Sequence, residues 1–155
     1  MTPAIRAAER AGIIFEVLEY VHRADAESYG LEAAEALGLP PGMVFKTLVA
    51  RMDGRDLIVG MVPVDRSLDL KALAAACGGK RAEMAQIGEA ERATGYVAGG
   101  ISPIGQRRRL PAVLDSGALA LERIAVSGGR RGLQICLAPA DLIRLAGAGS
   151  APIAR

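Results

Sequence analysis

The residue in this sequence with the clearest potential for chemistry is Lys46, which interrupts the apolar run from Met43 to Ala50. Side chains alternate along a strand, so Lys46 and Thr47 are expected on opposite faces. Both faces of the run are otherwise largely apolar, which is typical of a central strand. A lysine on such a strand must snorkel to an edge, pair with a carboxylate or face a ligand cavity, and the pattern leaves all three open.

A second candidate is the glycine-rich segment from Thr94 to Gln106, whose centre reads Gly99-Gly100-Ile101-Ser102-Pro103. Glycines let backbone N–H groups approach a ligand, so this segment can present donors to a carbonyl oxygen or a phosphate. An ester carbonyl that becomes an oxyanion would be stabilised by such donors. The same composition is also compatible with a plain loop between two strands.

Several classes of site are not expected. His22 is the only histidine, and the two cysteines, Cys77 and Cys136, form no CxxC pair. A zinc site, a disulfide framework and a Ser-His-Asp triad are therefore disfavoured, and neither a GxGxxG fingerprint nor a P-loop occurs. We expect no metal and no cofactor. His22, beside Tyr20, can hydrogen-bond a substrate or serve as a partly buried structural residue.

The net charge is only +2, but basic residues gather in the second half of the chain, at Lys80-Arg81, Arg107-Arg108-Arg109 and Arg130-Arg131. Such clusters serve either as phosphate contacts or as an ordinary solvated surface. The last pair belongs to the glycine-rich turn from Ser127 to Gly132. This turn is either a tight hairpin or a second rim of the same cavity as the Gly99 segment.

Helix caps, glycines and hydrophobic periodicity predict the elements that must position these residues. Asp53-Gly54 between two β-rich runs is the clearest hairpin signal. Residues 147–155 are expected to be a frayed tail. Helices are predicted over residues 3–11, 28–37, 70–77, 87–93 and 139–145, and strands over 13–21, 43–52, 56–62, 81–84, 96–97, 112–115, 123–127 and 133–137.

The interleaved elements predict one α+β (α/β) domain over residues 1–155, with a mixed, curved β-sheet flanked by helices, because some strand connections are too short for a parallel crossover. Apolar residues make up 51% of the chain and aromatics only 3%, so we expect an aliphatic core. The apolar runs fall short of the roughly 20 residues of a membrane span. The chain is expected to be cytoplasmic, without membrane contact.

Taken in order, several segments resemble the YbaK family of aminoacyl-tRNA deacylases, specifically its bacterial Cys-tRNA(Pro) deacylase branch. The match runs along nearly the whole chain. The segments that carry it include Val44-Phe45-Lys46-Thr47-Leu48, Leu68-Asp69-Leu70-Lys71, Thr94-Gly95-Tyr96, Gly99 to Pro103, Arg109-Leu110-Pro111, Val126 to Gly129 and Arg131-Gly132-Leu133.

The resemblance implies the fold of the editing domain of prolyl-tRNA synthetases and release of a mischarged amino acid from the tRNA 3′ end. Lys46 stands at the position of the family's essential lysine, and the Gly99 segment matches its GxxxP loop. Gln134 replaces an aspartate of close relatives, and Ser28-Tyr29 replaces an Asn-Phe pair. The expected catalytic residues are Lys46, Gly99, Gly100, Ile101 and Ser102, and the expected binding residues are Tyr20, His22, Tyr29, Thr47, Pro103, Ser127, Gly128 and Gln134.

The resemblance and the lack of a nucleophile-base pair together predict substrate-assisted release, in which the thiol of a mischarged cysteine attacks its own ester. Two alternatives stay open at this point. One is a deacylase for alanine or serine that uses activated water, and the other is a non-catalytic module that binds tRNA or a synthetase. The expected partners are the aminoacyl-tRNA 3′ end and a prolyl-tRNA synthetase.

Overall fold

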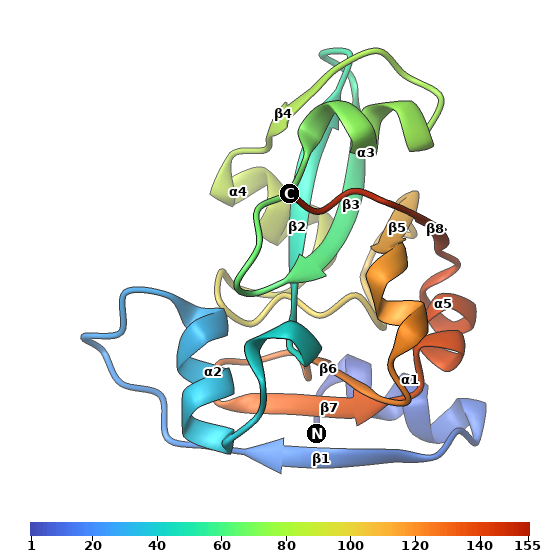
Figure 1. Ribbon diagram of the computed structural model, residues 1–155. Helices are drawn as coiled ribbons and strands as arrows, with labels where there is room; N and C mark the ends of the chain where they lie inside the picture. The colour runs from blue at the N-terminus through green and yellow to red at the C-terminus, as the bar shows by residue number, and fades with distance from the viewer.

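The computed structural model describes residues 1–155 and contains five α-helices, two short 3-10 helices and eight strands (Figure 1). Their order is α1 (Pro3–Ala11), β1 (Phe15–Glu19), α2 (Tyr29–Leu37), η1 (Pro41–Met43), β2 (Phe45–Met52), β3 (Asp56–Pro63), α3 (Leu70–Ala76), β4 (Ala82–Met84), α4 (Ile87–Thr94), β5 (Ala112–Asp115), η2 (Ser116–Ala120), β6 (Ile124–Ser127), β7 (Leu133–Leu137), α5 (Pro139–Ala146) and β8 (Gly149–Ala151).

The strands form two sheets. A five-stranded mixed sheet has the order β4-β2-β3-β5-β8, in which β3-β5 and β5-β8 are parallel pairs. A three-stranded antiparallel sheet has the order β1-β7-β6 and lies beneath the long β2–β3 hairpin in Figure 1. The predicted mixed sheet and α+β class are confirmed, but the single sheet divides in two, joined through the isolated bridge between Val44 and Ala125.

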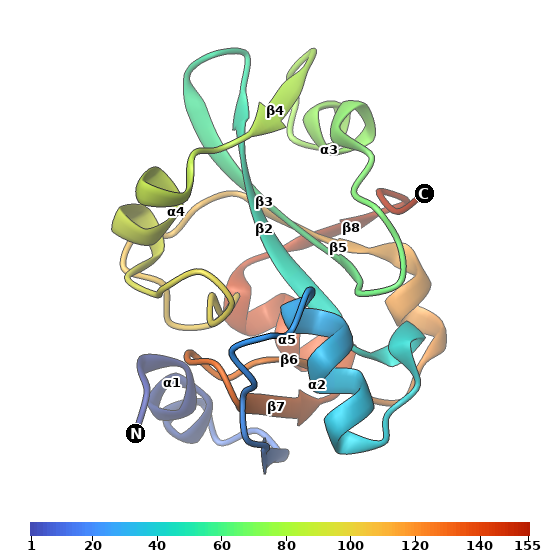
Figure 2. The same cartoon turned by 90° about the vertical axis from the view of Figure 1, so that its left-hand side faces the viewer.

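The β2–β3 hairpin follows the sequence pattern closely. Asp53 and Gly54 both have positive φ, 52° and 71°, which is the geometry of a type I′ turn that favours this residue pair. The alternation along β2 separates two parts of the core: Phe45 and Val49 pack with the larger buried cluster, whereas Ala50 packs with a second cluster under α3. Helices α3 and α4 accordingly lie on opposite sides of the hairpin (Figure 2).

Helices α1 and α3 begin at side-chain caps. The Thr2 hydroxyl accepts a hydrogen bond from the Ile5 amide at 3.2 Å, and Asp69 accepts one from Ala72 at 3.0 Å. Each such cap satisfies a backbone donor that the first helical turn leaves free. The predicted aliphatic core is confirmed, since Phe45 and Tyr96 are its only buried aromatic residues. None of the helices combines the length and apolar character needed to cross a membrane.

Two predictions about local structure were wrong. Tyr96 and Val97 form no strand; the Tyr96 hydroxyl instead donates to the Ile104 carbonyl at 2.6 Å and holds a loop closed. Residues 147–155 are not frayed, because β8 extends the sheet and the Ile153 side chain is fully buried. The Asp115 carboxylate accepts the Ile153 amide at 3.0 Å, a contact from far along the chain that the tail's glycine-rich composition does not reveal.

Candidate active site

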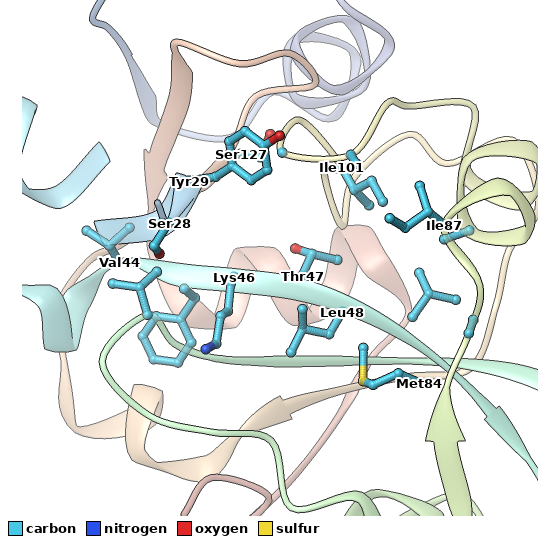
Figure 3. A pocket seen from close by; sticks show the side chains of 18 of the residues that line it. Ser28, Tyr29, Val44, Lys46, Thr47, Leu48, Met84, Ile87, Ile101 and Ser127 are labelled. Carbon is cyan, nitrogen blue, oxygen red and sulfur yellow. The ribbon is translucent and has the colours of Figure 1, made fainter. Parts of the chain in front are cut away.

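A cavity of about 400 Å³ opens at the edge of β2. Its walls come from six places in the chain: the start of α2, the first half of β2, Val64 just after β3, the β4–α4 connection with α4, the glycine loop, and the β6–β7 hairpin. Figure 3 shows the side chains that line it. The predicted residues that line the cavity are Tyr29, Lys46, Thr47, Gly99, Ile101, Ser127 and Gln134.

The cavity exists because β2 has an unpaired edge. Strand β4 pairs only with residues 50–52 of β2, and the bridge to β6 lies at Val44, so no strand pairs with residues 46–48 along that edge. The Val49 carbonyl accepts the Ala85 amide at 3.0 Å on the β4 side. Backbone groups alternate in direction along a strand, so those of Thr47 also face the open edge. A ligand can therefore approach the backbone of β2 here.

Thr47 contributes a polar atom to the cavity that the protein leaves unsatisfied. Its hydroxyl oxygen is buried and has no hydrogen-bond partner. Figure 3 shows the side chain pointing toward the part of the cavity that contains Tyr29, Ile101 and Ser127. A buried hydroxyl without a partner costs free energy, which a ligand can recover by hydrogen bonding to it.

Lys46 lies at the cavity on the other side of β2 from Thr47, as the alternation predicts (Figure 3). The side chain is half-buried and its ammonium has no carboxylate within 4.0 Å, so the structural ion pair considered above is not formed. An unpaired cation beside a cavity attracts anionic or strongly polar ligand groups.

Gln134 also lines the cavity. It lies on β7, directly across from Ser127 on β6, so the two side chains share one face of the sheet. Gln134 is only 7% exposed, and its Oε1 atom is buried without a hydrogen-bond partner. Buried amide oxygens are nearly always satisfied in folded proteins. Gln134 and Thr47 therefore both line the cavity, and each carries a buried oxygen without a hydrogen-bond partner.

The glycine loop is held rigidly at one side. The Ala98 amide donates to Glu91 of α4 at 2.8 Å, and Arg131 donates to the Ala98 carbonyl at 2.8 Å. Burial raises the pKa of Tyr96 to about 12, so its hydroxyl remains a hydrogen-bond donor to the loop at neutral pH. The amides of Gly99 and Ile101 donate to no protein acceptor. These two residues line the cavity, and their amides have no partner within the protein.

The rest of the predicted loop lies just outside the cavity lining. The Gly100 amide is already bonded to the Val97 carbonyl at 2.8 Å, and no space exists for a side chain there. Ser102 is fully buried and its hydroxyl accepts the Ile104 amide at 3.2 Å. Pro103 and Gly128 are also buried behind the rim. These residues shape the loop and support the two amides that reach the cavity.

Tyr29 forms the mouth of the cavity. The guanidinium of Arg131 lies 5.0 Å from the centre of the Tyr29 ring, a cation–π arrangement. On the loop side, a Cβ atom added to Gly99 would lie 2.7 Å from the ring, and Gly99 has a φ of +84°. The glycine is therefore required both for the backbone conformation and for the close approach of the ring.

His22 and Tyr20 do not line the cavity. The His22 Nδ1 atom is 2.8 Å from the buried carboxylate of Glu32, and its ring centre is 5.7 Å from that of Tyr29. Burial raises the pKa of the Tyr20 hydroxyl, whose side chain packs against the cluster under α2. The structure thus favours the structural interpretation of His22 over direct substrate contact.

Some lining residues were not anticipated from the sequence. Glu27 places a carboxylate at the cavity, and Met84 and Ile87 form an apolar wall on the α4 side. Ile87 is 66% exposed at the first position of α4, and no pattern in the sequence marks it as a cavity residue. The cavity lining therefore combines an apolar wall, the Glu27 carboxylate and the unpaired Lys46 ammonium with residues that carry unpartnered oxygens and amides.

Relatives of known sequence match most of this chain. The family model of the aminoacyl-tRNA editing domain matches residues 25–145. The predicted Cys-tRNA(Pro)/Cys-tRNA(Cys) deacylase EbsC of Enterococcus faecalis is 39% identical over 93% of this chain and 87% of its own length. The multifunctional Ser/Thr-tRNA deacylase ProXp-y of Escherichia coli K12 is 32% identical over 73% of this chain and 70% of its own length.

Two solved structures are also similar to this chain over nearly its whole length. A protein described as a candidate trans-editing enzyme for prolyl-tRNA synthetase superposes with a TM-score of 0.83 at 28% identity, covering 100% of this chain and 99% of the other. The hypothetical protein APE2540 has the same fold, with a TM-score of 0.87 at 22% identity over 99% of both chains. The resemblance noted in the sequence is confirmed, and the chain belongs to the family of aminoacyl-tRNA editing domains.

Proposed function

We propose that this protein is a cytoplasmic trans-editing deacylase that releases cysteine from mischarged Cys-tRNA(Pro). Family membership and the similarity to the Enterococcus faecalis relative support this assignment. The observation that carries it is the pairing of buried, unsatisfied oxygens on Thr47 and Gln134 with free amides on Gly99 and Ile101 around one small cavity. Such a cavity can hold an aminoacyl ester and stabilise charge on its carbonyl oxygen.

In the proposed reaction the substrate supplies the nucleophile. The cysteine sulfur forms a bond to its own ester carbonyl carbon, and the bond from that carbon to the ribose oxygen breaks. The proton of the thiol ends on the ribose hydroxyl, and the amino acid leaves as a thiolactone. A thiol suits this step, because a few per cent of it is already thiolate at neutral pH. The protein then needs to position the ester and stabilise its oxyanion.

Each part of the cavity has a role in this proposal. The Gly99 and Ile101 amides donate to the developing oxyanion, and the apolar wall at Ile87 excludes water that would otherwise compete. Thr47 and Gln134 orient the amino acid. The Lys46 ammonium, on the other side of the β2 edge, holds the terminal nucleotide and favours the thiolate by its charge. The anchored loop supports this role, since oxyanion donors are effective when they are already in position.

A second candidate is release of serine or threonine through an activated water. The Escherichia coli relative, named for that activity, favours it. So do the unsatisfied oxygens of Thr47 and Gln134, because a substrate hydroxyl is a stronger hydrogen-bond donor than a thiol. In this case the hydroxyl would bind in the cavity as a recognition group, and water would attack the ester.

A panel of purified mischarged tRNAs separates the two candidates. We expect Cys-tRNA(Pro) to be deacylated faster than Ser-, Thr- or Ala-charged tRNA, and mass spectrometry to detect thiolactone before free cysteine. Faster release of serine or threonine would establish the second candidate. Binding without release from any charged tRNA would show that the module is not catalytic.

The role of Lys46 is tested in the same assay. Lys46→Ala should reduce kcat/KM by at least about tenfold, since one lost charge-assisted contact is worth roughly 1.5–3 kcal/mol. Lys71→Ala, at a lysine outside the cavity, is the matched control. A Lys46→Ala protein that works at the parent rate would refute this role. Addition of prolyl-tRNA synthetase to the assay shows whether that enzyme is a partner in tRNA selection.

A further inference from the structure

A hollow of about 680 Å³, separate from the cavity described above, is lined by arginines. We call it the arginine hollow. Guanidinium-bearing residues converge on it from three elements that are distant in the sequence: the β2–β3 hairpin, α4 and the segment before β5. They are Arg51, Arg55, Arg92, Arg108 and Arg109. The only carboxylates in the lining are Asp56 and Glu89, so the hollow carries a clear excess of positive charge.

Most of this charge is not neutralised within the protein. Arg51 pairs with Glu89 and also donates to the Arg55 carbonyl at 2.7 Å. Arg55, Arg92, Arg108 and Arg109 are exposed and have no carboxylate within 4.0 Å. Like charges brought together on a surface repel one another, and an arrangement of this kind favours a polyanion. The planar fork of arginine matches phosphate oxygens in particular.

The position of this hollow connects it to the cavity. Ile87 and Ala90 of α4 line the cavity, whereas Glu89, Arg92 and Ala93 line the arginine hollow, so the two lie on different faces of one helix. A helix with its side chains is about 10–12 Å across. An extended ligand chain whose end enters the cavity can therefore pass α4 and continue into the arginine hollow. Figure 2 shows α4 on one side of the β2–β3 hairpin and α3 on the other.

We propose that the arginine hollow binds the phosphodiester backbone of the RNA whose 3′ end occupies the cavity. The inference rests on the proposed function for the identity of the RNA, but the contact itself is electrostatic and independent of sequence. It would let a small domain with no base-reading module hold its substrate through the acceptor end.

The test is binding of a fluorescein-labelled RNA hairpin ending in CCA, measured by anisotropy over a range of KCl concentrations. Arg92→Gln with Arg108→Gln should weaken binding at low salt by roughly fivefold or more and reduce the slope of log Kd against log salt by about 1 to 2. The control is Arg66→Gln with Arg155→Gln, which removes the same charge from exposed arginines outside the hollow. The control should bind as the parent does.

Release of cysteine from cysteinyl-adenosine, which has no phosphate, separates this proposal from the proposed function. The double variant at Arg92 and Arg108 should cleave it at the parent rate. Unchanged hairpin binding in that variant would overturn the proposal, as would a loss confined to binding of prolyl-tRNA synthetase. If the parent cleaves neither cysteinyl-adenosine nor any charged tRNA, the proposed function fails, while hairpin binding still decides the role of the arginines.

Discussion

Gln134 and Ser127 face each other across β7 and β6 with their side chains on the same face of the sheet, and the buried Oε1 atom of Gln134 has no partner. Gln134→Met keeps an unbranched side chain and removes that oxygen. We expect kcat/KM to fall about tenfold, the value of one hydrogen bond to the substrate, while the free energy of unfolding stays equal or rises by about 1 kcal/mol. Deacylation kinetics and urea unfolding check the two parts. A parallel fall in stability would instead make Gln134 a structural residue.

Alanine substitutions at Gly99 and at Gly12 separate the effect of backbone strain from the effect of a steric clash with Tyr29. Both have positive φ, +84° and +68°, but a Cβ at Gly99 meets the Tyr29 ring, whereas one at Gly12 meets nothing within 4 Å. Each Gly→Ala change should cost about 1–2 kcal/mol of stability through the left-handed backbone. Only Gly99→Ala should also lower kcat/KM, by at least about tenfold. Equal activity of the two variants would show that the position of Tyr29 is unimportant.

Glu32 gives the protein a defined acid sensitivity. Burial alone would raise its pKa, but hydrogen bonds from the Arg23 amide, at 2.6 Å, and from His22 outweigh burial and hold the pKa below its ordinary value of 4.5. The ionised form is therefore favoured in the folded state. Glu32 stabilises the fold above pH 4.5, and this stabilisation is lost as the pH falls through the lowered folded-state pKa.

The corresponding experiment follows the melting temperature from pH 7 to pH 3. Glu32→Gln should be about 1–2 kcal/mol less stable at pH 7 and should show a shallower loss of stability in acid. Glu35→Gln, at an exposed position of the same helix, should follow the parent curve. An unchanged acid transition in Glu32→Gln would contradict this account.

The carboxyl-terminal segment should contribute substantially to stability. Ile153 is completely buried, so Ile153→Ala should lower the free energy of unfolding by about 2–4 kcal/mol. Ile14→Ala removes the same atoms from a residue that is 91% exposed and should change stability by less than about 0.5 kcal/mol. Chemical denaturation measures both, and similar values for the two would mean that the segment adds little.

Local signals explain what the sequence revealed. The Thr2 cap and the Asp53-Gly54 turn are decided by residues a few positions apart, and both elements form where they are predicted. The opposite faces of Lys46 and Thr47 follow from strand alternation in the same way. These features depend on covalent geometry and neighbouring residues alone, so a single sequence is sufficient to locate them.

What the sequence left open depends on distant contacts. The open edge of β2 arises because β4 ends at Met84, and the tail is ordered by Asp115. Tyr96 has the β-propensity of a strand residue, but its hydroxyl is bonded to Ile104 across the loop. Likewise, nothing near His22 in the sequence identifies Glu32 as its partner. Tertiary pairing decided each of these cases.

The β1–β7 pairing also has a kinetic consequence. Phe15 is paired with Leu137, and the neighbouring strand β6 joins the same sheet, so this sheet closes only when the two halves of the chain meet. Loop closure over such a separation must be completed before its contacts stabilise anything, and folding slows as the mean separation of contacts grows. We therefore expect β1 to join the locally formed β6–β7 hairpin, which bears Gln134, late in folding.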